Sequence, residues 1–201
     1  SLLEMGEKDK ATATVEYLGS FLRTALSQGQ EMTTLANELD HTASYLEIQR
    51  LRFEGELSFE ILDAGAPATA QLPKLILQPL VENAIVHGFQ ENARSAVVRV
   101  VVEGGDDTLQ LVVEDNGDGM SEEELTKVNR ALSHAEEEEE LYFGLRNTAS
   151  RIRLTFGEEY GITLHESELR GVRAVITLPL AQRETPPADG SLAAISRKGA
   201  G

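Results

Sequence analysis

Residues 77–88 read LQPLVENAIVHG, and this stretch decides the fold. At about 100° per residue, a helix over this stretch carries one apolar stripe formed by Leu80, Val81, Ala84 and Ile85. Asn83 and His87 lie one turn apart and share the flank of that stripe. A buried amide needs partners, so Asn83 is either satisfied within the fold or committed to a ligand or metal ion. Taken by itself, the Asn83–His87 pair favours a role within the fold, because one pair of polar residues a turn apart is a weak motif. The motifs downstream shift the interpretation toward a ligand.

Composition places the sequence among globular proteins. It has 201 residues, of which 41% are hydrophobic, enough for one or two domains with a substantial core. Asp and Glu number 34 against 18 Lys and Arg, and the net charge of −16 argues against nucleic acid or an anionic membrane as a general partner. The lack of cysteine excludes disulfides and thiolate metal sites. With no signal peptide or bilayer-spanning apolar run in the sequence, we expect this portion to be cytoplasmic, even if a longer protein is membrane-anchored.

The first quarter of the chain predicts two amphipathic helices. Apolar residues recur at helical spacing over residues 10–28 and again over residues 33–53. Thr33 or Thr34 can cap the second helix, and the simplest arrangement is an antiparallel hairpin. Such narrow seams fit either a helical bundle or a dimerisation stem, and periodicity does not choose between them. We assign residues 1–56 to this helical stem.

A mixed α/β pattern follows. Residues 57–62 alternate with the period of a strand. Pro73 suits a helix N-terminus, whereas Pro79 lacks the N–H for a bond to the preceding turn, so the central helix should kink or restart there. Two valine-rich runs, residues 97–102 and 109–113, predict an antiparallel hairpin.

The last third predicts two helices and a second pair of strands. Ser121 and Glu124 form a capping-box pattern that opens a helix to about Leu132. A longer helix runs from about Gly144 to Gly157, and strands at 162–166 and 172–179 flank a turn at Gly171. The remaining predictions concern an exposed, mobile loop with five consecutive glutamates over residues 134–140, and a disordered tail over residues 181–201.

Asp115-Asn116-Gly117-Asp118-Gly119 directly follows a predicted strand. One interpretation is a glycine-rich turn at a strand end. The other is a site where two glycines let the backbone approach a flat ligand while a carboxylate points inward. Such a carboxylate accepts a hydrogen bond from an exocyclic amine such as that of adenine, and it repels a phosphate unless a cation intervenes.

Gly144-Leu145-Arg146-Asn147 opens a predicted helix with further arginines downstream. Unpaired N–H groups at a helix start, with arginine nearby, make an anion site. The segment is equally compatible with an ordinary basic surface helix.

In this order, the three segments resemble the ATP-binding domain shared by histidine kinases, type II topoisomerases, Hsp90 chaperones and MutL proteins. Within that superfamily, residues 75–89 (LILQPLVENAIVHGF) and 45–57 (YLEIQRLRFEGEL) look like the sensor histidine kinases of the LytS and YesM type. The resemblance covers roughly residues 10–180 and is specific, because the motifs fall in the correct order within a matching pattern of strands and helices.

The resemblance implies an α+β fold over residues 57–180: a two-layer α/β sandwich whose mixed, mainly antiparallel sheet carries helices on one face. By the same resemblance Asn83 would bind Mg²⁺, His87 would face the phosphates of ATP, and Asp115 would recognise adenine. Residues 120–143 would form a lid. The other nucleotide-binding residues implied are Gly117 and Gly119, which would line the base pocket, and Gly144, Leu145 and Arg146, which would close over the phosphates.

The function implied is that of the ATP-binding catalytic portion of a two-component sensor histidine kinase. The γ-phosphoryl group of Mg·ATP would pass to a histidine upstream of this chain and then to a response regulator, and the protein would be a homodimer through its stem. We therefore expect that this chain does not phosphorylate itself. Its first histidine, His41, is predicted to be a helix-surface residue, and His134 and His165 are predicted to be ordinary as well.

Three departures from the family pattern predict a modest affinity for nucleotide. Tyr142 stands where a glycine of the lid hinge is usual, a late glycine pair is reduced to Gly171, and Glu136–Glu140 places negative charge near the expected triphosphate. One alternative is therefore a degenerate nucleotide-binding and dimerisation module without kinase activity. The other is an ATP-hydrolysing switch, which the sequence disfavours because Pro79 occupies the position one turn before Asn83 where an acid would be needed.

Overall fold

The computed structural model describes residues 31–54, 56–88, 95–133 and 142–180, with the side chains of residues 87 and 88 excluded. The helices of this part are α2 (Leu35–Arg52), α3 (Gln78–Gly88), α4 (Glu122–Ser133) and α5 (Phe143–Phe156). The strands are β1 (Met32–Thr34), β2 (Leu57–Asp63), β3 (Gln71–Pro73), β4 (Ala96–Gly104), β5 (Thr108–Asp115), β6 (Gly161–Glu166) and β7 (Val172–Pro179).

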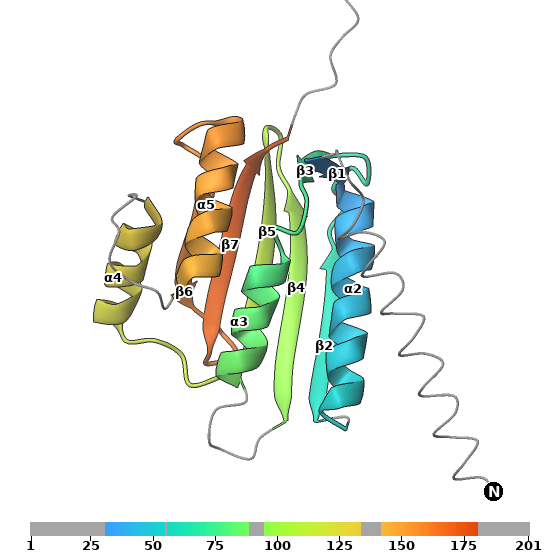
Figure 1. Ribbon diagram of the computed structural model, residues 1–201, viewed down its shortest axis with the longest axis vertical. Helices are drawn as coiled ribbons and strands as arrows, with labels where there is room; N and C mark the ends of the chain where they lie inside the picture. Colours follow the sequence, from blue (N-terminus) through green and yellow to red (C-terminus); the bar gives the residue numbers. More distant parts are fainter. Residues whose placement is uncertain (1–30, 55, 89–94, 134–141, 181–201) are drawn as a thin grey trace, which may run out of the picture.

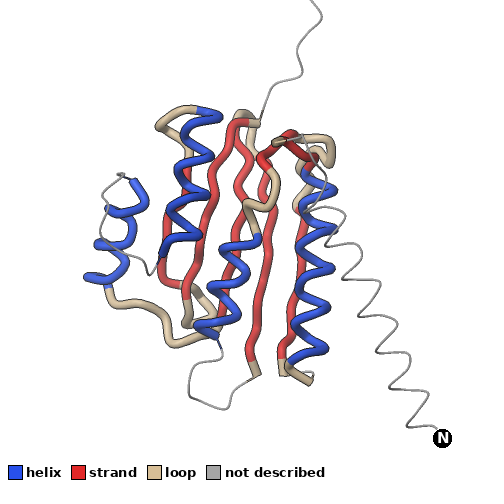
Figure 2. Tube along the Cα trace, in the orientation of Figure 1, coloured by secondary structure: helices blue, strands red, loops and turns tan. Residues whose placement is uncertain are grey.

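The main sheet has the strand order β2-β4-β5-β7-β6. β2 pairs with β4 in parallel, and every other neighbouring pair in this sheet is antiparallel. The described helices lie over one face of the sheet, with α3 across its middle and α2 along its β2 edge (Figures 1 and 2). The predicted two-layer sandwich with a mixed, mainly antiparallel sheet is therefore confirmed.

Alternation along the strands builds the core between these layers. On β4 the residues at every second position are buried, and they face the helices. The apolar stripe predicted for α3 is buried against them, since Leu80, Val81, Ala84 and Ile85 are each at most 5% exposed. Each such side chain contributes about 1.5–3 kcal/mol when fully buried, or less for the small Ala84, so the stripe anchors α3 firmly on the sheet.

Local chemistry sets the helix ends much as the sequence predicts. Thr34 caps α2, because its Oγ1 accepts the N–H of Asn37 at 3.3 Å. Ser121 and Glu124 form the predicted capping box at α4, with the Glu124 N–H donating to Ser121 Oγ at 3.3 Å and the Ser121 N–H donating to Glu124 Oε2 at 2.8 Å. α5 ends at Phe156 and is followed by Gly157, whose φ of 116° is accessible to glycine and strained for other residues.

The prediction for Pro73 is wrong. Pro73 ends the short strand β3, which pairs with β1, and no helix begins there. α3 begins instead at Gln78, so Pro79 lies in its first turn, where the missing N–H removes no helical hydrogen bond. The helix therefore starts beside Pro79, and neither the predicted kink nor the predicted restart occurs there.

α2 packs into the same core as the sheet. Its Leu35 and Leu46 are fully buried together with Leu72 and Leu77 from the segment that precedes α3. The first predicted helix (residues 10–28), the acidic loop with His134 and the tail lie outside the described residues. The division between stem and ATP-binding part at residue 56 therefore stays a prediction. None of the helices in the described ranges has the length and apolar character needed to cross a bilayer.

His41 is not on the helix surface as predicted, because it is only 2% exposed. The apolar residues of α2 mark only part of the helix face that packs against the core. That face also buries Glu38, Thr42 and Gln49. His165 is exposed, and its ring nitrogen lies 3.0 Å from Thr163 Oγ1.

The burial of His41 makes stability depend on pH. Burial lowers the pKa of His41 below its ordinary value of 6.5. A group with a depressed folded pKa contributes stability that is present above its unfolded pKa and is lost as the pH falls through the folded pKa. We expect the difference in unfolding free energy between wild type and His41→Gln to shrink from about pH 7.5 to about pH 5.5 in urea titrations. Parallel pH profiles for the two proteins would contradict this assignment.

Candidate functional site

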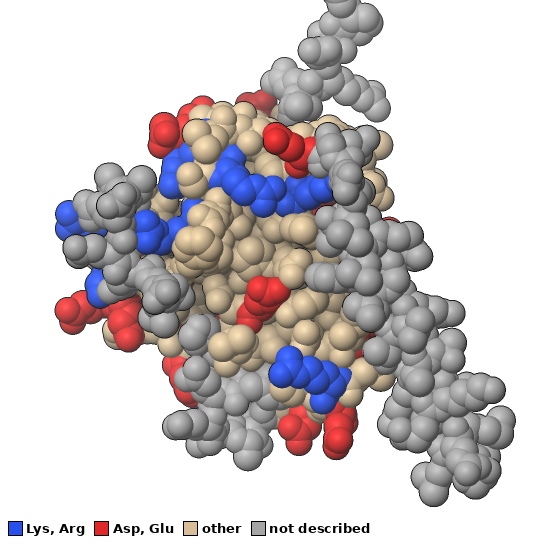
Figure 3. All heavy atoms as spheres, viewed as in Figure 1, with Lys and Arg blue, Asp and Glu red and all other residues tan. Residues whose placement is uncertain are grey.

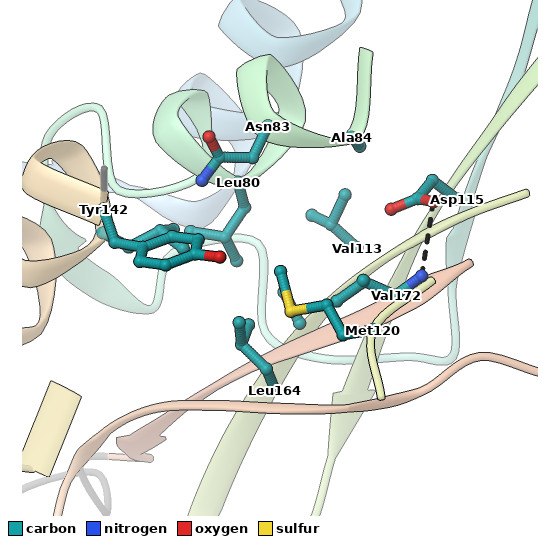
Figure 4. A pocket seen from close by; sticks show the side chains of 11 residues that line it. Leu80, Asn83, Ala84, Val113, Asp115, Met120, Tyr142, Leu164 and Val172 are labelled. Atoms are coloured by element: carbon teal, nitrogen blue, oxygen red, sulfur yellow. Dashed lines mark hydrogen bonds between the residues drawn. The ribbon is translucent and has the colours of Figure 1, made fainter. Parts of the chain in front are cut away.

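A cavity of about 30 Å³ lies between α3 and the sheet (Figure 4). Two polar side chains, Asn83 from α3 and Asp115 from the end of β5, line a wall that is otherwise mostly apolar. The other lining residues are Leu80, Ala84, Val113, Met120, Tyr142, Leu145, Leu164, Val172 and Ala174. Of the residues singled out by the sequence, Asn83, Asp115 and Leu145 therefore meet in one place.

Asp115 is the last residue of β5 and is 5% exposed. Its Oδ1 accepts the backbone N–H of Gly117 at 2.8 Å and that of Val172, on β7, at 3.3 Å. These donors fix the orientation of the carboxyl group, and a carboxylate oxygen points into the cavity in Figure 4. The arrangement presents a hydrogen-bond acceptor at a buried, mostly apolar surface, as recognition of an exocyclic amine requires.

Two glycines allow the turn after Asp115 to pack closely on the turn before β7. A Cβ on Gly171 would lie 2.0 Å from Asp115 Oδ1 and 2.6 Å from the Gly117 nitrogen. Gly119 has a φ of 74°, and a Cβ there would lie 2.8 Å from the Arg170 carbonyl oxygen. From the sequence, Gly171 is predicted only to lie in a turn between two strands and to be the remnant of a glycine pair. The structure shows that a glycine is required at that position to seat Asp115.

Asn83 projects from α3 above the cavity, close to the Tyr142 ring in Figure 4. Its amide oxygen is a hard oxygen donor of the kind that Mg²⁺ accepts, so the residue fits the proposed ion. The neighbouring Glu82 is hydrogen-bonded within the same helix, since its Oε1 accepts a hydrogen bond from Gln78 Nε2 at 2.6 Å. His87 lies in the last turn of α3, and its side chain is outside the described residues.

The start of α5 lies against the start of α3. A Cβ on Gly144 would meet Pro79 Cβ at an ordinary 3.5 Å, while Leu145 is buried in the cavity wall and Arg146 is half-buried. The N-cap position holds Tyr142, whose side chain does not cap the first turn. The first N–H groups of α5 and Arg146 thus form a candidate anion site beside the cavity.

Tyr142 replaces the glycine expected from the resemblance without backbone strain, since its φ is −122°. Its ring is half-buried against the core and lines the cavity. A cavity of about 30 Å³ is far smaller than the roughly 300–1,000 Å³ of typical ligand sites. Tyr142, the N-cap residue of α5, forms part of the wall that limits this volume.

The helix-covered face carries a local concentration of positively charged side chains. Figure 3 shows a band of Lys and Arg side chains on this face, although the chain has a net charge of −16. Lys74 and Arg151 line a shared groove beside β1 and β3. Acidic side chains gather mainly toward the edges of the face in the same view.

Comparison with known proteins gives two family matches. The model of the histidine kinase-, DNA gyrase B- and HSP90-like ATPases matches residues 68–182, which is more than half of the 201-residue chain. The histidine kinase model matches residues 1–57.

Among curated proteins, the sensor histidine kinase YesM of Bacillus subtilis is 34% identical over 179 residues, which cover 89% of this chain and 29% of YesM. The sensor histidine kinase BtsS of Escherichia coli is 31% identical over 173 residues, which cover 86% of this chain and 28% of BtsS. The chain therefore spans less than a third of the length of these relatives.

Solved structures share the fold. The catalytic domain of the histidine kinase ThkA has a TM-score of 0.58 at 15% identity, over 74% of this chain and 95% of that domain. The ATP-binding domain of PrrB from Mycobacterium tuberculosis has a TM-score of 0.52 at 21% identity, over 75% of this chain and 97% of that domain.

Proposed function

This chain belongs to the family of histidine kinase-, DNA gyrase B- and HSP90-like ATPases, and from that membership we propose that it binds Mg·ATP for phosphoryl transfer to a histidine. The protein in question would be a two-component sensor histidine kinase of which this chain is the catalytic portion. The observation that carries the proposal is the Asp115 carboxyl group, held by two backbone N–H groups at an apolar cavity with Asn83 opposite.

Asp115 would accept a hydrogen bond from the exocyclic amine of adenine. The close packing permitted by Gly119 and Gly171 keeps that carboxylate in place, and Gly117 supplies one of the N–H groups that orient it. Leu80, Val113 and their apolar neighbours would exclude water from the base, which strengthens the hydrogen bond.

Asn83 would hold Mg²⁺, and His87 would lie toward the phosphates. When bound, the ion would neutralise negative charge on the phosphates. The first turn of α5, with Gly144, Leu145 and Arg146, would offer N–H groups and a cation to the same phosphates.

In the transfer step, an imidazole nitrogen of the upstream histidine forms a bond to the γ-phosphorus, and the bond from that phosphorus to the β-phosphate oxygen breaks, releasing ADP. Positioning and charge neutralisation account for most of the rate in such a reaction. His41 does not suit the acceptor role because it is buried. Pro79 stands one turn before Asn83, where a hydrolase would need an acid to activate water.

The same proposal covers the partners. A response regulator would receive the phosphoryl group, and the solved ThkA structure in complex with the response regulator TrrA is a precedent in that protein. We further propose that the chain is a homodimer through residues 1–56, that it works in the cytoplasm, and that the longer protein is anchored in a membrane.

A second candidate function is a degenerate form of the nucleotide-binding domain that no longer binds ATP and serves only for dimerisation. The observation that favours it is Tyr142, which lines a cavity too small for a purine in this conformation. Binding of ATP distinguishes the two functions.

Calorimetry with and without Mg²⁺ tests the proposal. We expect wild type to bind ATP more tightly with Mg²⁺, and Asn83→Ala to lose most of that increment, about tenfold, while its metal-free binding stays. Val86→Ala is the matched control, because Val86 lies on the same helix and is 58% exposed. If wild type shows no binding at millimolar ATP, the kinase proposal fails in favour of the degenerate module.

A further inference from the structure

A buried carboxylate links α2 to the segment that leads into α3. Glu38, on α2, is only 1% exposed. Its Oε2 accepts the N–H of Leu75 at 2.9 Å, and its Oε1 accepts the N–H of Leu77 at 3.0 Å. Both carboxyl oxygens are therefore used to hold one short stretch of backbone. Burial raises the pKa of Glu38, and these N–H groups oppose that shift.

The stretch that Glu38 holds is the origin of α3. The Leu77 carbonyl oxygen accepts the N–H of Leu80 at 3.1 Å and that of Val81 at 3.0 Å, so Leu77 opens the helix. Leu75 has a φ of 57°, an uncommon conformation for leucine that must be maintained by its surroundings. The hydrogen bond from the Leu75 N–H to Glu38 is one of the contacts that maintain it.

α5 holds the same stretch from the other side. The Arg151 Nη2 group donates a hydrogen bond to the Lys74 carbonyl oxygen at 2.8 Å. Residues 74–77 are thus fixed between α2 and α5, and they continue into the helix that carries Asn83. Through the hydrogen bonds of Glu38, α2 is attached directly to the backbone that leads into the first turn of α3.

The connection also joins the two family matches. α2 lies within residues 1–57, which match the histidine kinase model, whereas α3 lies within residues 68–182, which match the ATPase model. Glu38 belongs to the first segment, and the N–H groups that it accepts belong to the second.

We propose that Glu38 is a positioning residue that couples α2 to the nucleotide site by setting the place of α3 and therefore of Asn83. This inference rests on the proposed function, because Asn83 is taken to hold the ion. Coupling of this kind is reciprocal: if α2 positions the site, Mg·ATP must in turn tighten the attachment of α2.

Glu38→Gln in the whole chain tests the coupling. Glutamine offers one acceptor oxygen and an NH₂ group, so it can accept from only one of the two N–H groups and presents a donor to the other. Leu46→Ala is the matched control, because Leu46 is a fully buried residue of the same helix whose contribution is apolar packing. Both variants should lower the unfolding free energy. Only Glu38→Gln should weaken Mg·ATP binding, by about tenfold.

Hydrogen exchange supplies a readout that needs no nucleotide. Amides of residues 75–81 should exchange faster in Glu38→Gln than in Leu46→Ala at equal global stability, and Mg·ATP should slow exchange in α2 of wild type. Equal affinities and equal exchange in the two variants would overturn the coupling.

If wild type does not bind ATP, the proposed function fails, and the exchange comparison still decides the coupling. If Glu38→Gln does not fold, Arg151→Ala takes its place, because Arg151 is an exposed residue. Amide exchange at residues 75–77 is then measured in that variant.

Discussion

Asp115→Asn should weaken ATP binding by about 10- to 100-fold while the protein stays folded. Two backbone N–H groups, from Gly117 and Val172, converge on Oδ1, so they should select the amide oxygen for that position. The NH₂ group is then left facing the cavity, where it meets the exocyclic amine of adenine donor to donor. Losing a hydrogen bond to a charged acceptor costs about 1.5–3 kcal/mol, which gives the expected range.

The same exchange should change base preference. Guanine presents an oxygen acceptor where adenine presents an amine, so the ratio of ATP to GTP affinity should fall in Asp115→Asn. Calorimetry with both nucleotides measures it, and thermal unfolding verifies the fold. Asp118→Asn is the control, because Asp118 is an exposed acid in the same turn. Wild-type ATP affinity in Asp115→Asn would rule out this cavity as the base site.

Gly171→Ala should lower the unfolding free energy by about 3 kcal/mol and reduce ATP binding below detection. The new Cβ would lie 2.0 Å from Asp115 Oδ1 and 2.4 Å from the Asp115 carbonyl oxygen, so two backbone turns must separate. Such a separation breaks the hydrogen bond from the Val172 N–H that orients the carboxylate.

Gly144→Ala is the matched control for that substitution. Its Cβ meets nothing closer than Pro79 Cβ at 3.5 Å, and alanine is favoured over glycine within a helix by roughly 1 kcal/mol. Urea unfolding should therefore show Gly144→Ala to be as stable as wild type, or slightly more stable. If the two alanine variants were equally stable, the close packing at Gly171 would not be essential.

Short-range patterns in the sequence predict the helix and strand layout because their causes act within a turn or along a strand. The α3 stripe, the Thr34 cap and the box of Ser121 with Glu124 depend on neighbours three or four residues away. The antiparallel hairpin of β4 and β5 likewise joins consecutive strands across a short turn. The roles given to the site residues came from the resemblance, and the structure adds that Asn83, Asp115 and Leu145 meet at one cavity.

Long-range contacts account for what the sequence could not show. The burial of His41 and Glu38 depends on what covers α2, since neither side chain belongs to an apolar pattern. Pro73 is in a strand because β1 pairs with it.

The sequence by itself therefore determined the described helices and the strands of the main sheet, the apolar face of α3 and the family. Only the tertiary structure decided that Gly171 must lack a side chain and that Glu38 holds the origin of α3. The physical reason is distance along the chain: the Asp115 contact with Val172 spans 57 residues, and that of Glu38 with Leu75 spans 37. Local periodicity carries no information about such pairs, because packing alone brings their atoms within hydrogen-bond distance.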